Sequence, residues 1–173
     1  MAEPMTERTS SNSDHVGRIM AQWAVERPDL DVSPQGVIGR LHRLAVALTE
    51  ELVAVYAEFG LGEGEFDVLA TLRRTGAPFE LTPGELAATT MVSSGAVTKR
   101  VDRCIAQGWA TRRTSDRDAR GRVIALTPAG RKLIDAAFEA HMANEHRLVA
   151  GLGDLERARL ARLLEVWGRH LDA

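Results

Sequence analysis

Two helix signals separated by a short turn occupy the middle of the chain, and they restrict its fold more than any other feature. The segment LTPGELAATTM predicts a helix that begins at Pro83. Thr82 can cap the first backbone N–H groups of this helix, and Glu85 follows at the spacing of a capping box. The segment VSSGAVTKRVDRCIAQGW predicts a second helix that begins near Ser93. A short helix, a tight turn and a second helix together predict a helix-turn-helix.

The second helix is amphipathic, and a basic hairpin follows it. Its apolar face consists of Val97, Val101, Cys104 and Ile105. Gly108 is expected to end the helix, and the segments ATRRT and RVIALT are two short strand candidates joined by the polar loop SDRDARG. The sequence therefore predicts a winged helix-turn-helix, in a chain that is mainly α-helical with a small β-wing.

Basic residues are concentrated in this part of the chain. Between Ser93 and Lys132 there are ten basic and three acidic residues, a net charge of +7. The whole chain has 22 Lys and Arg against 24 Asp and Glu, a net charge of −2, so the remaining residues carry −9. A basic patch of this kind attracts phosphates and releases counterions, which favours DNA as the partner.

The DNA contacts are expected from the second helix and from the wing. In a winged helix, the N-terminal half of the second helix enters the major groove. The predicted contact residues on this helix are Ser93, Ser94, Gly95, Thr98, Lys99 and Arg103. Those on the wing are Arg117, Arg120 and Arg122, which suit the minor groove or its phosphates. Gly95 can equally mark a close contact between helices, and any single wing arginine can be a solvated charge.

The rest of the chain reads as helices around this lobe. Residues 1–13 are polar and are expected to be a disordered tail, 14–59 an added helix and a long helix, 60–127 the DNA-binding lobe, and 128–173 two C-terminal helices. The long helix is expected from Pro34 to about Phe59, and the last two from Pro128 to about Gly151 and from Leu155 to His170. A helix in the segment EFDVLATLRRTG is expected to point Phe66, Leu69 and Leu72 inward.

Composition and motifs exclude several other classes of protein. The sequence has no apolar run of membrane-spanning length and no signal-peptide pattern, so we expect a cytoplasmic protein. The five histidines have no spacing suited to a metal, and we expect no metal and no cofactor. Cys104, the single cysteine, is expected to be buried and inert, with a redox switch as the alternative. No phosphate loop or nucleophile motif indicates an enzyme.

The segments LTPGELA, VSSGAVTKRVDRCIAQGW and DRDARGRVIALTPAGRKL resemble the winged helix of the MarR family of bacterial transcription regulators. The wing with Asp116, Asp118, Arg120 and Arg122, followed by LTPAG, is the most specific part of the resemblance. The resemblance implies a homodimer that pairs helices from both chain ends and binds a pseudopalindromic operator. The apolar residues of the last two helices that suit a dimer interface include Leu133, Phe138, Leu148, Leu160, Leu164 and Trp167.

The segments RIMAQWAVERPDLDVSP and FDVLATLRRTG further resemble the urate-responsive branch of that family, which includes the PecS-type regulators. Carried over residue by residue, the effector site of this branch corresponds to Trp23, Asp67, Arg74, Arg100 and Arg112. The resemblance thus implies a small planar anion such as urate as effector. The chemistry of the set is reasonable by itself, because Asp67 and Arg74 share a helix face and Trp23 offers a flat surface to a ring.

Each of these residues also has a structural interpretation. Trp23 can belong to the core, and Asp67 can form a salt bridge with Arg74 or Arg100. Sequence alone does not separate Arg74 from its neighbour Arg73, and Arg112 can simply contact phosphate. The sequence therefore predicts a ligand-responsive DNA-binding regulator, expected to be a repressor. The alternatives are a MarR-type regulator of another phenolic or aromatic effector, an effector-independent DNA-bridging architectural protein, and a protein-interaction module that uses the acidic helical body.

Overall fold

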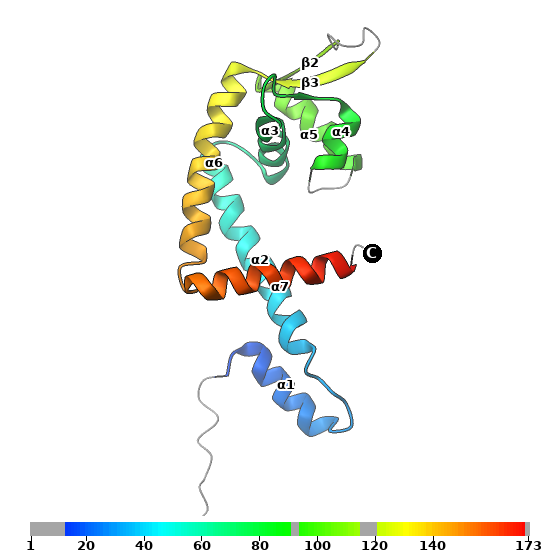
Figure 1. Ribbon diagram of the computed structural model, residues 1–173, viewed down its shortest axis with the longest axis vertical. Helices are drawn as coiled ribbons and strands as arrows, with labels where there is room; N and C mark the ends of the chain where they lie inside the picture. Colours follow the sequence, from blue (N-terminus) through cyan, green and yellow to red (C-terminus); the bar gives the residue numbers. More distant parts are fainter. Residues whose placement is uncertain (1–12, 91–93, 115–120, 172–173) are drawn as a thin grey trace, which may run out of the picture. The chain divides into compact units, whose positions relative to one another are not determined.

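The computed structural model describes residues 13–90, 94–114 and 121–171. It consists of two compact units, Met1–Glu50 and Glu51–Ala173, which are described separately. Figure 1 shows that the described elements are helices apart from one small sheet, so the predicted fold class is confirmed. The expected disordered tail lies outside the described residues except for Ser13.

The first unit contains α1 (His15–Glu26) and the first part of α2 (Gln35–Glu58). The predictions of an added N-terminal helix and of a long helix are therefore confirmed. The side chain of Val16 on α1 is buried, and an added Cβ at Gly39 of α2 would lie 3.1 Å from its Cγ1 atom. The two helices thus meet closely where α2 has a glycine.

Asp14 links the start of α1 to α2. Its Oδ1 atom accepts a hydrogen bond of 2.8 Å from the backbone N–H of Gly17, which caps α1. The Arg40 guanidinium donates two further bonds to the same carboxylate, from Nε to Oδ2 at 2.9 Å and from Nη2 to Oδ1 at 2.8 Å. These contacts with Arg40 lower the pKa of Asp14, since they favour the ionised form.

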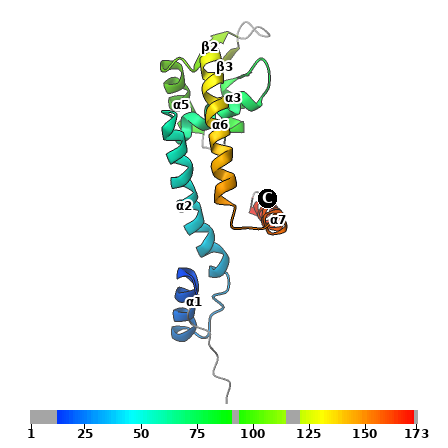
Figure 2. The same cartoon turned by 90° about the vertical axis from the view of Figure 1, so that its left-hand side faces the viewer.

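The second unit contains the remaining helices and the sheet. Its elements are the last part of α2, α3 (Glu63–Arg74), β1 (Glu80–Leu81), α4 (Pro83–Thr89), α5 (Ser94–Ala106), β2 (Ala110–Thr114), β3 (Arg122–Leu126), α6 (Pro128–Leu148) and α7 (Asp154–Leu171). All the helices expected in this part of the chain are present, with ends within a few residues of their predicted positions. Figure 2 shows α6 leading away from the β2–β3 hairpin toward α7.

The sheet has three antiparallel strands in the order β1-β3-β2. The two strands of the predicted hairpin pair with each other, with Arg112 opposite Ile124 and Thr114 opposite Arg122. β1, which pairs Glu80 with Ala125 and Leu81 with Ile124, is an additional strand that the sequence pattern did not predict. A strand of two residues is too short to show the alternation by which strands are recognised.

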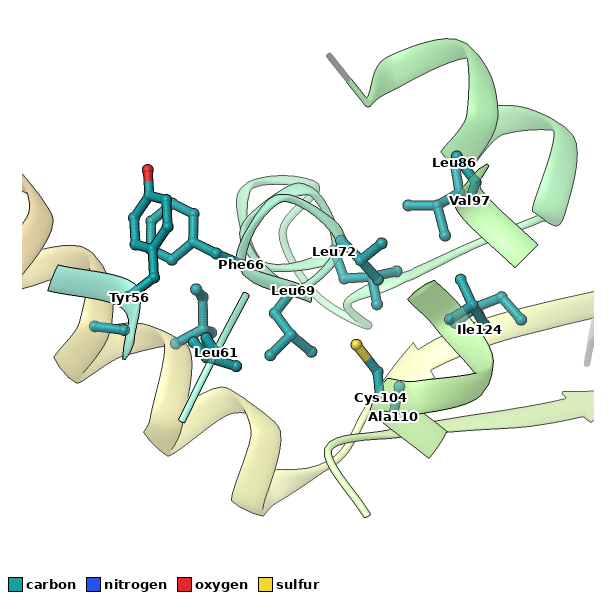
Figure 3. Packing of buried hydrophobic residues seen from close by; sticks show 14 residues of the cluster. Tyr56, Leu61, Phe66, Leu69, Leu72, Leu86, Val97, Cys104, Ala110 and Ile124 are labelled. Atoms are coloured by element: carbon teal, nitrogen blue, oxygen red, sulfur yellow. The ribbon is translucent and has the colours of Figure 1, made fainter. Parts of the chain in front are cut away.

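The core of the second unit lies between α3, α4, α5, α6 and the sheet. Leu69 and Leu72 of α3 are fully buried and Phe66 is 6% exposed, which confirms the predicted inward face. Leu72 lies close to Leu86 of α4 and Ile124 of β3 in Figure 3. The same cluster includes Val97, Val101 and Cys104 of α5, so both helices of the helix-turn-helix and the wing pack on one core.

The segment LTPAG fixes the start of α6 under the wing. The Thr127 hydroxyl accepts a hydrogen bond of 2.9 Å from the backbone N–H of Gly130, which caps the helix. The backbone N–H of Thr127 donates to the carbonyl of Trp109 at 3.0 Å. An added Cβ at Gly130 would lie 1.9 Å from that Trp109 carbonyl oxygen, so only glycine allows this approach.

Candidate DNA-binding and effector site

The start of α4 has the predicted capping box. The Thr82 hydroxyl accepts a hydrogen bond of 3.2 Å from the backbone N–H of Glu85, and the Glu85 carboxylate accepts one of 2.8 Å from the backbone N–H of Thr82. This prediction is confirmed. The box fixes the orientation in which α4 enters the helix-turn-helix.

The apolar face of α5 is buried as predicted. Val97, Val101 and Cys104 are 4% exposed or less, and Ile105 is half-buried. The helix ends at the predicted glycine, where Gly108 has a positive φ of 73° and the backbone N–H of Trp109 donates to the Cys104 carbonyl at 2.9 Å. These contacts fix the rotation of α5, and with it the face that the helix presents to solvent.

The predicted DNA contacts on α5 have different surroundings. Thr98 and Lys99 are exposed, and Ser94 and Gly95 form the first turn of the helix. Ser93 lies outside the described residues. The Nε atom of Arg103 donates to the Oε1 atom of Glu65 on α3. Arg103 is therefore engaged in an ion pair within the chain, which the sequence did not predict.

The wing contributes one described residue to the predicted contact set. Arg122 is exposed at the first position of β3, where it pairs with Thr114. Arg117 and Arg120 lie outside the described residues. On the body of the wing, Arg113 of β2 forms an ion pair with Glu80 of β1, which ties the added strand to the hairpin.

Arg100 lies on the side of α5 that faces the first turn of α3. An added Cβ at Gly64 would lie 2.3 Å from its Nε atom and 2.8 Å from its Cζ atom, so the guanidinium packs directly on the glycine. Its Nη1 atom is buried and has no hydrogen-bond partner among the residues that the structure describes. A buried, unpaired guanidinium nitrogen is costly and is well suited to receive an anion.

Asp67 and the two neighbouring arginines all lie on α3. Asp67 is half-buried. Arg74 is exposed and donates from Nη2 to the carbonyl of Thr89, at the end of α4. Arg73 instead bonds Asp135 of α6 at 2.6 Å, and its guanidinium lies 5.1 Å from the centre of the Phe79 ring. The structure thus separates the two arginines, since Arg73 binds α6 and Arg74 binds α4.

Arg112 lies on β2 beside α5. Its Nη2 atom donates a bond of 2.9 Å to the Asp102 carboxylate of α5. It also lines a cavity of about 70 Å³ with Leu86, Thr98 and Val101, between α4, α5 and the wing. Movement of β2 relative to α5 would therefore change the surroundings of this arginine.

Trp23 belongs to the other unit. It lies on α1 and is 45% exposed, so it is not a core residue of Met1–Glu50. The other four residues of the predicted effector set lie in Glu51–Ala173. Within that unit the structure assigns Arg74 and Arg112 partners on α4 and α5 and leaves the Nη1 atom of Arg100 without a described partner.

The roles of Glu65 and Gly64 in this region were not predicted from the sequence. Glu65 is 8% exposed, and its Oε2 atom accepts a bond of 3.1 Å from the backbone N–H of Gly62. The segment GEGE resembles an ordinary helix start with acidic residues, and that pattern predicts a cap. It gives no indication that α5 packs against it.

Three further features concern the cysteine, possible metal ligands and membrane-spanning helices. Cys104 is fully buried, and burial raises the pKa of its thiol to about 12. Within residues 13–90, 94–114 and 121–171, no group of three or more His, Cys, Asp or Glu side chains is arranged to hold a metal ion. No helix in these same ranges is long and apolar enough to span a membrane.

Comparison with known proteins places these features in one family. A family model described as MarR family matches residues 59–121. The HTH-type transcriptional regulator PecS of Dickeya dadantii (strain 3937) is 38% identical over 156 residues, which cover 90% of this chain and 94% of PecS. The multiple antibiotic resistance protein MarR of Escherichia coli (strain K12) is 28% identical over 103 residues, or 59% of this chain and 69% of that protein.

Solved structures agree with the fold. AbsC, a MarR family transcriptional regulator from Streptomyces coelicolor, superimposes with a TM-score of 0.74 at 22% identity, covering 83% of this chain and 97% of AbsC. A mutant MarR from E. coli complexed with operator DNA superimposes with a TM-score of 0.66 at 26% identity, covering 79% of this chain and 97% of that one. Together with the near full-length similarity to PecS, these matches show that the chain belongs to the MarR family of DNA-binding transcriptional regulators.

Proposed function

We propose that this protein is a homodimeric repressor that binds a pseudopalindromic operator and is released from it by a small planar anion such as urate. In this proposal residues 60–127 form the DNA-binding lobe, residues 14–59 serve dimerisation and the effector side, and residues 128–173 supply the C-terminal dimerisation helices. The observation that carries the effector part is the buried Nη1 atom of Arg100, which has no partner among the described residues.

The DNA contacts are proposed on two elements. The start of α5 enters the major groove with Ser93, Ser94, Gly95, Thr98 and Lys99, and the wing reaches the minor groove with Arg117, Arg120 and Arg122. The exposure of Thr98, Lys99 and Arg122 supports this arrangement. So does the net charge of +7 between Ser93 and Lys132, in a chain that is otherwise acidic.

Dimerisation is proposed through helices from both chain ends. None of the 18 residues of α7 is buried within the described chain, although the helix has apolar residues along it. Leu160 and Leu164 are 43% and 41% exposed, and Leu163 is 58% exposed. A helix with this much exposed apolar surface is typical of an interface, and the two-fold symmetry of a dimer matches a pseudopalindromic operator.

The effector is proposed to bind Trp23, Asp67, Arg74, Arg100 and Arg112. A planar anion would accept hydrogen bonds from guanidinium groups and stack on the tryptophan ring. Arg100 belongs to α5. An anion that binds Arg100 therefore stabilises the position of α5 in which the anion is bound most tightly. If that position differs from the one required by the operator, the effector releases the DNA.

Titration of a preformed DNA complex tests this proposal. The DNA beside the protein's own gene is bound by the protein, and urate, xanthine and salicylate are added in turn while fluorescence anisotropy is recorded. We expect urate to release the DNA. Release only by xanthine or salicylate would support a ligand-responsive regulator but reject urate as its effector. Specific DNA binding that none of the three compounds reverses would reject the effector site.

A variant pair connects the release to the proposed residues. Trp23→Phe combined with Asp67→Asn removes the indole and one charge, and we expect operator binding close to that of the wild type with release by urate abolished. Glu63→Gln is the matched control, since it removes an exposed carboxylate from the first turn of the same helix. Normal release by the double variant would show that the site lies elsewhere.

A further inference from the structure

The face of α5 toward α3 bears two arginines in different electrostatic situations. Arg100 and Arg103 are three residues apart and therefore lie on neighbouring turns of one helix face. Arg100 packs on Gly64 and leaves a buried nitrogen unpaired within the described chain, whereas Arg103 is paired with the Glu65 carboxylate. Among the described residues, the contact between α5 and α3 thus contains one paired arginine and one arginine with an Nη1 atom that has no partner.

Both oxygen atoms of Glu65 are engaged. Oε2 accepts the backbone N–H of Gly62 at 3.1 Å and thereby closes the first turn of α3, and Oε1 accepts the Nε–H of Arg103. The Glu65 side chain is 11% exposed, whereas the Arg103 side chain is 63% exposed. A carboxylate this deeply buried depends on its partners, so displacement of α5 that separates Arg103 from Glu65 is costly.

The position of the pair connects the DNA-reading helix to the rigid part of the lobe. α3 contributes Val68, Leu69 and Leu72 to the core with no exposed surface, so Glu65 is fixed by the packing of its own helix. Arg103 lies on the same helix as Lys99, one turn further along. The ion pair therefore fixes the position and rotation with which α5 presents its exposed residues.

We infer that Glu65 and Arg103 form a positioning pair that holds α5 in its DNA-reading position, and that Arg103 acts through Glu65 rather than by contacting a phosphate. The inference rests on the proposed function only in that α5 reads DNA. It assigns a role in operator binding to an acidic residue, which by charge alone would oppose DNA.

The inference is testable because attraction by charge alone and positioning of α5 predict opposite changes in DNA affinity when Glu65 is substituted. Glu65→Gln retains an oxygen that can accept the Gly62 N–H but removes the negative charge. If electrostatic attraction alone mattered, its removal would strengthen DNA binding and free Arg103 to contact a phosphate. If the pair positions α5, the same substitution weakens binding.

The experiment measures affinity and its salt dependence for an operator that the purified protein selects from a random duplex library. The variants are Glu65→Gln, Arg103→Gln and their combination, with Glu63→Gln as the control for charge and Lys99→Gln as the control for a phosphate contact. We expect each single variant of the pair to weaken binding about tenfold and the double variant to be no weaker than either single one. Their slopes of log affinity against log salt stay at the wild-type value, while Lys99→Gln lowers the slope by about 0.9.

Three results would overturn the inference. One is a slope for Arg103→Gln that falls as it does for Lys99→Gln, and another is Glu65→Gln binding as tightly as the wild type or more tightly. The third is a Lys99→Gln variant with unchanged affinity and slope, which would show that α5 does not face DNA and would reject the proposed function as well. Circular dichroism melts establish that each variant is folded. If Glu65→Gln fails to fold, the salt slopes of Arg103→Gln and Lys99→Gln still decide whether Arg103 contacts a phosphate.

Discussion

The guanidinium of Arg100 packs on the backbone of Gly64, where a side chain would place its Cβ atom 2.3 Å from Nε and 2.5 Å from Cδ. Gly64 lies in the first turn of α3, a position that has no need of a positive φ, so packing rather than backbone conformation requires the glycine. The absence of a side chain at residue 64 thus determines where the proposed anion-binding arginine of α5 can lie.

Gly64→Ala should therefore disturb the effector response more than the fold. The added methyl group forces the flexible Arg100 side chain away, while alanine gains up to about 1 kcal/mol over glycine inside a helix. We expect the urate concentration needed to release DNA to rise about tenfold or more, as for the loss of a charged hydrogen bond, with operator affinity changed far less. Gly84→Ala is the control, because nothing lies within 4 Å of its added Cβ. Equal urate responses of the two variants would contradict the proposed role of Arg100.

Gly130→Ala tests the junction between the wing and α6. The added Cβ would lie 1.9 Å from the Trp109 carbonyl oxygen, a backbone atom that cannot move aside without shifting the strand that follows. We expect a loss of about 1–3 kcal/mol in the free energy of unfolding, measured by urea denaturation. Gly151→Ala, with open space around its Cβ, should have little effect. A Gly130→Ala variant as stable as the wild type would mean that the junction adjusts freely.

Cys104 should act as a neutral core residue. Burial raises the pKa of its thiol to about 12, so the folded state favours the protonated form. The stability that this gives is fully present below the thiol's unfolded pKa of about 8.5 and is lost as the pH rises toward 12. From pH 9 to 11 the free energy of unfolding should therefore fall more steeply in the wild type than in Cys104→Ala, by up to about 1.4 kcal/mol per pH unit.

A second observation checks the same assignment. At pH 7 the folded protein should react with a thiol reagent far more slowly than the protein unfolded in urea, and peroxide should leave operator binding unchanged. Reaction of Cys104 in the folded protein at the rate of an exposed thiol would instead favour the redox switch that the sequence left as an alternative.

Most of the structural features predicted from the sequence depend on interactions between residues that are close together in the chain. The capping box of Thr82 and Glu85, the end of α5 at Gly108 and the inward face of α3 all depend on residues within a few positions of one another. Such features depend on the spacing of residue types along the chain, which can be recognised in a single sequence. The order of helices, turn and hairpin followed from them.

Partners distant in sequence were not predictable in this way. Periodicity placed Arg103 on the polar face of α5 but gave no sign of Glu65, 38 residues earlier, and it did not distinguish Arg73 from Arg74. These assignments depend on how α3 packs against α4, α5 and α6. The third strand was missed for the same reason, because Glu80 and Leu81 form a strand only through their pairing with β3.

In the proposed mechanism an anion held by Arg100 and the operator compete for the position of α5, and thermodynamic linkage between the two ligands measures this competition. Calorimetric titration gives the affinity of urate for the free protein and for the protein saturated with operator. We expect operator to weaken urate binding by the same factor by which urate weakens operator binding, since coupling between two sites is reciprocal. Urate that binds both forms equally well, or neither, would contradict it.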